Sequence, residues 1–266
     1  MTSAPAAGKN KHEGSGLGVI MAGAFGNLVE WYDWITYGLL ASIFAHSIFP
    51  SNDPSTGLIQ ALVTFAVGFA VRPIGAAVLS PLADKFGRRR MLAFTILMMG
   101  VGSLAIGLTP SYEQIGVAAP IIVLLARLLQ GFSAGGEFGT ATAFIIEHAK
   151  PHRRGLIGST QLAGIGLATL LANGTAALIT NVFPEGALQS WGWRLPFILG
   201  FLLSLFGLYL RKRVAESPEF QEIEQKEEVA RRPFFEALKT EPMGMFRVFM
   251  LEIMGSVPYY LWSVFL

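Results

Sequence analysis

The sequence predicts an all-α, polytopic membrane helical bundle. Only 14% of its 266 residues are charged and the mean hydropathy is +0.51, whereas a soluble domain carries about 25% charged residues. The apolar residues gather in long runs and do not alternate with polar ones as the strands of a membrane barrel do. Helices are then the way in which these runs satisfy their backbone groups inside hydrocarbon.

The apolar runs are long enough to cross about 30 Å of hydrocarbon. We expect six complete spans and the beginning of a seventh. The runs cover residues 18–49, 57–82, 91–109, 117–146, 156–183, 194–210 and 246–266. The predicted domains are a polar tail (1–16), a six-helix N-terminal bundle (17–211), a polar connector (212–245) and a truncated seventh span (246–266).

The positive charges predict how the chain is oriented. Seventeen of the 20 Lys and Arg residues lie in the tail, the 83–90 and 147–155 loops and the 211–247 segment. Because Lys and Arg collect on the cytoplasmic side, these segments and the N-terminus are predicted to be cytoplasmic. The same sorting argues against binding to nucleic acid, since the basic residues mark helix ends.

Metal, cofactor and enzyme chemistry are not expected. The chain has no cysteine, which excludes thiol catalysis and cysteine metal sites. Its four histidines are scattered over the tail, one helix end and a basic loop. No group of His, Asp and Glu collects at a membrane face, as an integral membrane enzyme would need.

Five charged residues fall within the first five apolar runs. Each would cost roughly 2.5–3.5 kcal/mol at the bilayer centre, so each must pair or face a cavity that holds water or substrate. They are Glu30, Asp33, Arg72, Arg127 and Glu137. Other interpretations stay open: Asp33 could be hydrated near the outer mouth, Glu30 could be a fixed partner of Arg127 or Arg72, and Glu137 could only lock two helices together.

The two acids of the first run lie three residues apart, on one helical face that also carries Asn27 and Tyr37. Two close carboxylates in a low dielectric cannot both ionise cheaply. We therefore expect Glu30 or Asp33 to exchange a proton, as a proton-coupled carrier requires.

Glycines in the fourth run indicate close helix packing. Gly131, Gly135 and Gly139 are spaced four apart, which predicts a small-residue ridge on one face of that helix.

Three short motifs resemble the major facilitator superfamily. In "SPLADKFGRRRML" (80–92), Asp84, Lys85, Gly87 and the arginines at 88–90 match the loop signature of that superfamily, while Ser80 replaces its usual first glycine. "RLLQG" (127–131) is similar to the fourth-helix signature of proton-coupled members, and "AESP" (215–218) to the motif after the sixth helix. "GNLVEWYDW", "LARLLQGFSAGGEFG" and "WGWRLPF" further resemble the metabolite:proton symporter family, the branch that includes alpha-ketoglutarate permease.

The resemblance implies twelve helices in two six-helix halves, a central site and proton symport. This chain would then be an N-terminal fragment in the bacterial inner membrane, which lacks its C-terminal half and does not catalyse uptake alone. The implied partners are protons, the lipid bilayer, the other half and a small-molecule substrate. An organic acid such as a dicarboxylate is the first choice, a proline- or betaine-type zwitterion the alternative, and a non-transporting membrane sensor on the same scaffold a further one.

The candidate residues follow from the buried charges and the resemblance together. A carboxylate substrate needs cationic partners, and arginine can hold it with two hydrogen bonds. The candidates are Glu30, Asp33, Arg127 and Glu137 for proton coupling; Asn27, Tyr37, Arg72, Arg127 and Gln130 for substrate binding; and Asp84, Gly87, Arg88 and Arg89 for a conformational latch.

Overall fold

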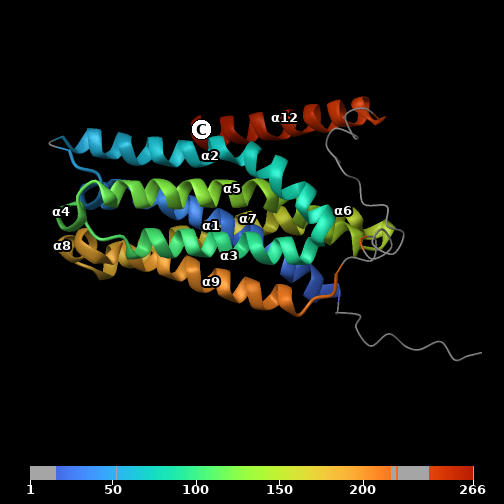
Figure 1. The fold of residues 1–266 in the computed structure, drawn as a ribbon, viewed down its shortest axis with the longest axis horizontal. Coiled ribbons are helices and arrows are strands. Elements are labelled where there is room, and N and C mark those ends of the chain that lie inside the picture. Colours follow the sequence, from blue (N-terminus) through green and yellow to red (C-terminus); the bar gives the residue numbers. More distant parts are fainter. Residues whose placement is uncertain (1–15, 52, 217–219, 221–239, 266) are drawn as a thin grey trace, which may run out of the picture.

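The structure, a computed structural model, describes residues 16–51, 53–216, 220 and 240–265 (Figure 1). Within these residues every regular element is a helix. The predicted tail and most of the predicted connector lie outside the described residues.

Six long helices and one further helix follow the predicted spans within a few residues. The long helices are α1 (Gly16–Ile48), α2 (Pro54–Phe86), α3 (Arg88–Leu108), α5 (Ala118–Glu147), α7 (Thr160–Val182) and α9 (Arg194–Lys212). The last helix is α12 (Pro242–Phe265). Short helices connect them: α4 (Tyr112–Ile115), η1 (Pro151–Arg153), α6 (Arg154–Gly158), α8 (Glu185–Ala187) and η2 (Leu188–Gly192).

Five segments of the described chain are long and apolar enough to cross a membrane. They are Ser55–Phe86, Arg88–Leu108, Ala118–Glu147, Pro151–Val182 and Arg194–Lys212. The segment that contains α1 is not among them. The length of α1 is sufficient, since it has 33 residues, as many as α2. Its apolar sequence, however, is interrupted by the carboxylates of Glu30 and Asp33.

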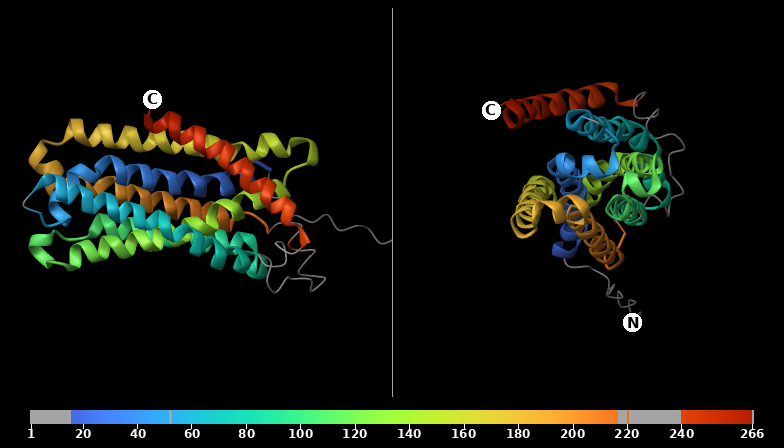
Figure 2. Two further views of the ribbon diagram at one scale, coloured as in Figure 1. Left: turned by 90° about the horizontal axis from the view of Figure 1, so that it is seen from above. Right: turned by 90° about the vertical axis from the view of Figure 1, so that its left-hand side faces the viewer.

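The helix α1 runs through the middle of the bundle (Figure 2). It contacts α7, α9, α5 and α2, while α2 packs along α5 and α3 packs between α5 and α9. Figure 1 shows the α2–α3 turn and α6 at one end of the bundle, and α4 and α8 at the other. We call the first of these the basic end, because the turn carries three consecutive arginines from residue 88. The helix α12 lies at the periphery beside α2 in Figures 1 and 2.

The boundaries of α2 have clear local causes. Asp53 caps its first turn, accepting hydrogen bonds from the backbone N–H groups of Ser55 (3.3 Å) and Thr56 (3.2 Å). The hydroxyl of Thr56 and these N–H groups hold the pKa of the exposed Asp53 carboxyl below its usual value. At the other end, Gly87 has φ of 98°, a conformation that favours glycine, and α3 begins at the next residue.

Close packing of α2 on α5 depends on glycine. A Cβ atom at Gly131 would overlap the backbone of Gly68, and one at Gly135 would overlap the backbone of Arg72. Gly139 has no neighbouring atom within 4 Å of such a Cβ position. The predicted ridge is therefore wrong at its third glycine and is limited to two residues. Four residues turn an α-helix by about 40° more than a full turn, so the third glycine has rotated away from α2.

Candidate functional site

The two acids of α1 do not share one site, because each has its own arginine. Glu30 forms an ion pair of 2.9 Å with Arg72 on α2. Asp33 forms one of 3.2 Å with Arg127 on α5. Since 3.6 residues make a helical turn, positions 30 and 33 point to neighbouring helices. The two pairs thus join α1 to both helices that the glycine contacts hold together.

The pair formed by Asp33 and Arg127 is completely enclosed. Both side chains are at most 1% exposed. The amide of Gln130 donates to the same carboxylate oxygen at 2.7 Å, and the hydroxyl of Ser103 donates to the other one. Arg127 also lies 3.7 Å above the ring of Tyr37. Hydrogen bonds from both sides and an aromatic face compensate this buried pair for lost hydration.

The pair formed by Glu30 and Arg72 is more open. The side chain of Arg72 is 23% exposed, whereas that of Glu30 is 3% exposed. The guanidinium lies 4.5 Å from the ring of Trp34 and 4.4 Å from that of Phe69. The same indole is 5.1 Å from the guanidinium of Arg127. One tryptophan therefore contacts both arginines of the site.

Several buried polar atoms of these pairs have no hydrogen-bond partner in the described part of the chain. They include Glu30 Oε2, Nε and Nη2 of Arg127, and Gln130 Oε1. Buried polar groups normally have hydrogen-bond partners, so buried donors and acceptors without one are a reason to expect water, a proton or a ligand at this site. Donors and acceptors are both available, which suits a carboxylate and a proton.

Two predicted substrate-binding residues have other contacts. Asn27 donates to the backbone carbonyl of Gln161 on α7 at 2.7 Å, and its own Oδ1 is buried without a partner. The hydroxyl of Tyr37 donates to the carbonyl of Ala61 on α2 at 3.0 Å. Tyr37 thus contacts Arg127 through its ring and not through its hydroxyl, while Asn27 connects α1 to α7.

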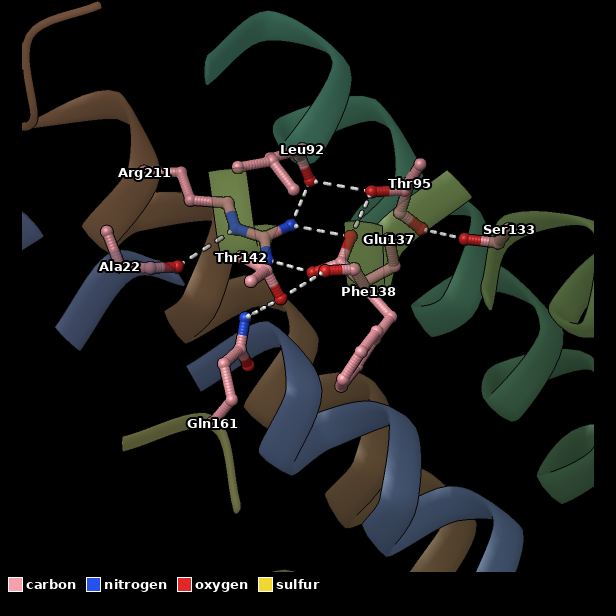
Figure 3. A network of polar contacts seen from close by, with 9 residues as sticks. All are labelled: Ala22, Leu92, Thr95, Ser133, Glu137, Phe138, Thr142, Gln161 and Arg211. Atoms are coloured by element: carbon pink, nitrogen blue, oxygen red, sulfur yellow. Dashed lines mark hydrogen bonds and ion pairs between the residues drawn. The ribbon is translucent and has the colours of Figure 1, made fainter. Parts of the chain in front are cut away.

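Glu137 on α5 has a different partner, because it pairs with Arg211 at the end of α9 (Figure 3). Both residues are buried. Sequence reasoning missed Arg211, because it appeared as one of the basic residues that flank a span. The signal available was a count: three acids and two arginines lay inside the first five predicted spans, so one acid was left without an arginine from these spans.

The latch residues find partners on two further segments. Arg88 pairs with Glu147 at the end of α5 and lies 3.8 Å from Asp84. The backbone N–H of Arg89 donates to the carboxylate of Glu216 at 2.9 Å, where the positive end of α3 favours an anion. A side chain at Gly87 would collide with that carboxylate.

Sequence reasoning named neither Glu147 nor Glu216 as a partner of the latch residues. Glu216 belongs to the "AESP" motif and could have been found from it. No comparable signal marks Glu147 in the sequence.

The comparisons with known proteins agree with this architecture. The family model described as "Sugar (and other) transporter" matches residues 19–245. The chain is 42% identical over 228 residues to the glycine betaine/proline/ectoine/pipecolic acid transporter of Dickeya dadantii, covering 86% of this chain and 45% of that protein. It is 40% identical over 200 residues to the alpha-ketoglutarate permease of Escherichia coli, covering 75% and 46%. For the citrate-proton symporter of Klebsiella pneumoniae the identity is 35% over 252 residues, covering 95% and 56%.

Solved structures confirm the fold. A partially occluded, inward-open structure of the xylose transporter of Escherichia coli superposes with a TM-score of 0.71 at 20% identity, covering 88% of this chain and 59% of that one. The chain spans about half the length of the curated relatives it matches. The predicted all-α membrane bundle and its resemblance to the major facilitator superfamily are confirmed, and the relatives include the predicted alpha-ketoglutarate permease together with betaine and proline transporters. The chain belongs to the sugar (and other) transporter family of the major facilitator superfamily.

Proposed function

We propose that the chain forms the N-terminal half of a proton-coupled symporter for small metabolites that carry a carboxylate. The observation that carries this proposal is the two acid–arginine contacts around α1, one fully enclosed and one partly open, both of which contain buried polar atoms without a hydrogen-bond partner in the described residues. Charges so placed in a membrane helix are expensive, and they mark substrate or proton pathways.

Protonation of an acid would release its arginine for substrate. When Glu30 or Asp33 takes a proton, the attraction to Arg72 or Arg127 falls, and the guanidinium is free to hold a carboxylate with two hydrogen bonds. Loss of the proton restores the internal pair and expels the substrate. Coupling then requires that the protonation states differ in their affinity for substrate.

The relatives support a carboxylate as the shared feature of the substrate. Betaine, proline, pipecolate, ketoglutarate and citrate all carry at least one carboxylate, and these compounds appear in the names of transporters that match this chain. We favour an organic acid. A zwitterion such as betaine is the second candidate, because Trp34 and Phe69 offer aromatic faces that can bind a quaternary ammonium group.

Orientation follows the positive charges. The basic end would face the cytoplasm, together with the N-terminus and the latch formed by Asp84, Gly87, Arg88 and Arg89. With a second six-helix half, rocking of the two halves would expose the central site to each side in turn.

Ligand binding by the purified chain in lipid nanodiscs tests the site directly. We expect citrate, ketoglutarate or betaine to bind, to take up protons from a weakly buffered solution, and to bind at least about tenfold more weakly to Arg127→Lys, which cannot make the two-point contact. Choline, which replaces the carboxylate of betaine by an alcohol, is the matched control ligand. Equal binding of choline and betaine, or unchanged affinity in Arg127→Lys, would contradict the assignment.

A further inference from the structure

One guanidinium at the basic end joins four helices. Arg211 lies in the last turn of α9, and its side chain is 1% exposed. Its Nε donates to the carbonyl of Ala22 on α1 at 3.1 Å, and its Nη1 donates to the carbonyl of Leu92 on α3. Both terminal nitrogens donate to the carboxylate of Glu137 on α5 (Figure 3).

The carboxylate in this network is also fully bonded. Thr95 on α3 donates its hydroxyl to Glu137, and Ser133 on α5 donates to the carbonyl of Thr95 at 2.6 Å. No side-chain atom of Glu137 or Arg211 is among the buried atoms without a partner in the described residues, whereas Glu30 and Arg127 both contribute such atoms. Because every polar atom of these two side chains already has a partner, a ligand would satisfy no further atom, and such a network holds one rigid arrangement.

The network lies directly against the backbone of α1. A Cβ atom at Gly26 would overlap both the guanidinium of Arg211 and the carboxylate of Glu137. Gly26 precedes Glu30 by four residues and Asp33 by seven, that is, by about one and two helical turns. The position of α1 relative to α5 is therefore fixed two turns from the place where Asp33 must meet Arg127.

We infer that Arg211, held by Glu137, is a positioning residue that keeps α1 in register with α3, α5 and α9. It neither binds substrate nor carries the coupling proton. This assigns Glu137 to the positioning network and leaves proton exchange to the acids of α1. The positioning role does not need transport to occur, so it can fail or hold independently of the proposed function, whereas the exclusion of Glu137 from proton coupling rests on that function.

Cysteine labelling of the chain in nanodiscs tests this inference, because the chain has no native cysteine. Thr36 on α1 is fully buried and lies about 15 Å along the helix from Gly26. Thr36→Cys therefore reports whether α1 has moved at a distance from Arg211. We expect the rate of labelling by N-ethylmaleimide to rise at least about tenfold when Arg211→Gln is added, because α1 then opens locally.

Two further variants make the result decisive. Glu137→Gln combined with Arg211→Gln removes both charges together, so it leaves no unpaired buried charge, and it should also raise labelling. Lys212→Gln removes the adjacent exposed cation of the same helical turn and should leave the rate unchanged.

Three results would overturn the inference. One is unchanged labelling of Thr36→Cys in the single and the double variant. Another is an equal rise in Lys212→Gln. The third is loss of helical structure in the double variant and in Arg211→Lys alike, since the pair would then support the whole fold and not the register of α1.

Discussion

A single methyl group at Gly135 should separate α2 from α5 and disturb the contact between Glu30 and Arg72. The Cβ atom of Gly135→Ala would overlap the backbone carbonyl of Arg72 and lie 2.7 Å from the backbone nitrogen of Ala76, whereas ordinary contact begins at 3.4 Å. Because both obstacles are backbone atoms, α2 must retreat by roughly 1 Å. Such a shift is enough to lengthen the 2.9 Å ion pair beyond hydrogen-bond range.

Gly139→Ala is the matched control for the change in the free energy of unfolding that Gly135→Ala causes. Both substitutions gain about 1 kcal/mol from helix propensity. The overpacked one loses about 1–3 kcal/mol, whereas Gly139 faces open space. The free energy of unfolding of Gly135→Ala should therefore be lower than that of Gly139→Ala by about 1–3 kcal/mol. At about 2–4 °C per kcal/mol, this difference lowers the melting temperature by several degrees. Thermal melting in one detergent measures this difference. Equal melting temperatures would refute the close approach of α2 and α5.

The remaining predictions concern the proton, the latch and the first turn of α2. In a hybrid carrier that joins this chain to the C-terminal half of the glycine betaine/proline/ectoine/pipecolic acid transporter of Dickeya dadantii, Glu30→Gln should spare substrate exchange and abolish proton-driven accumulation; unchanged accumulation would remove Glu30 from coupling. Gly87→Ala should lower stability by at least about 1–2 kcal/mol, because φ of 98° disfavours a side chain and the new methyl would meet the carboxylate of Glu216; thermal melting measures it, and no change would contradict the strained turn. The cap of Asp53, whose pKa is lowered by folding, should stabilise α2 above the unfolded value of about 3.8 and lose that effect as pH falls through the folded pKa; a fall in acid of the amide protection factors of Ser55 and Thr56, relative to the intrinsic exchange rate at each pH and absent in Asp53→Ala, would verify it.

The helices could be predicted from the sequence because membrane spans follow from composition alone. The predicted run 194–210 corresponds to α9 (Arg194–Lys212), and the predicted run 91–109 corresponds to α3 (Arg88–Leu108). Hydrocarbon thickness fixes the length of a span, and basic residues mark its ends, so both signals are local. The fifth run was less regular, since its first residues form α6 and a separate turn before α7 begins at Thr160.

The partners of the buried charges could be predicted only in part. Cost alone indicated that Glu30, Asp33 and Glu137 needed either a positive partner or a cavity that holds water or substrate. Which arginine serves each acid depends on the rotation of neighbouring helices, and one-dimensional spacing does not contain that rotation. Arg211 shows this limit best, because its position at a basic helix end was equally compatible with a charge exposed to water.

The indole of Trp34 lies between the two acid–arginine pairs of α1. Its ring contacts the guanidinium groups of Arg72 and Arg127 at once. Any motion of one cation redistributes its attraction to the π-electrons that the other cation also uses. This uncharged ring, which cannot titrate, thus links the two separate acid–arginine pairs of α1, and we expect a shift of one arginine to alter the surroundings of the other.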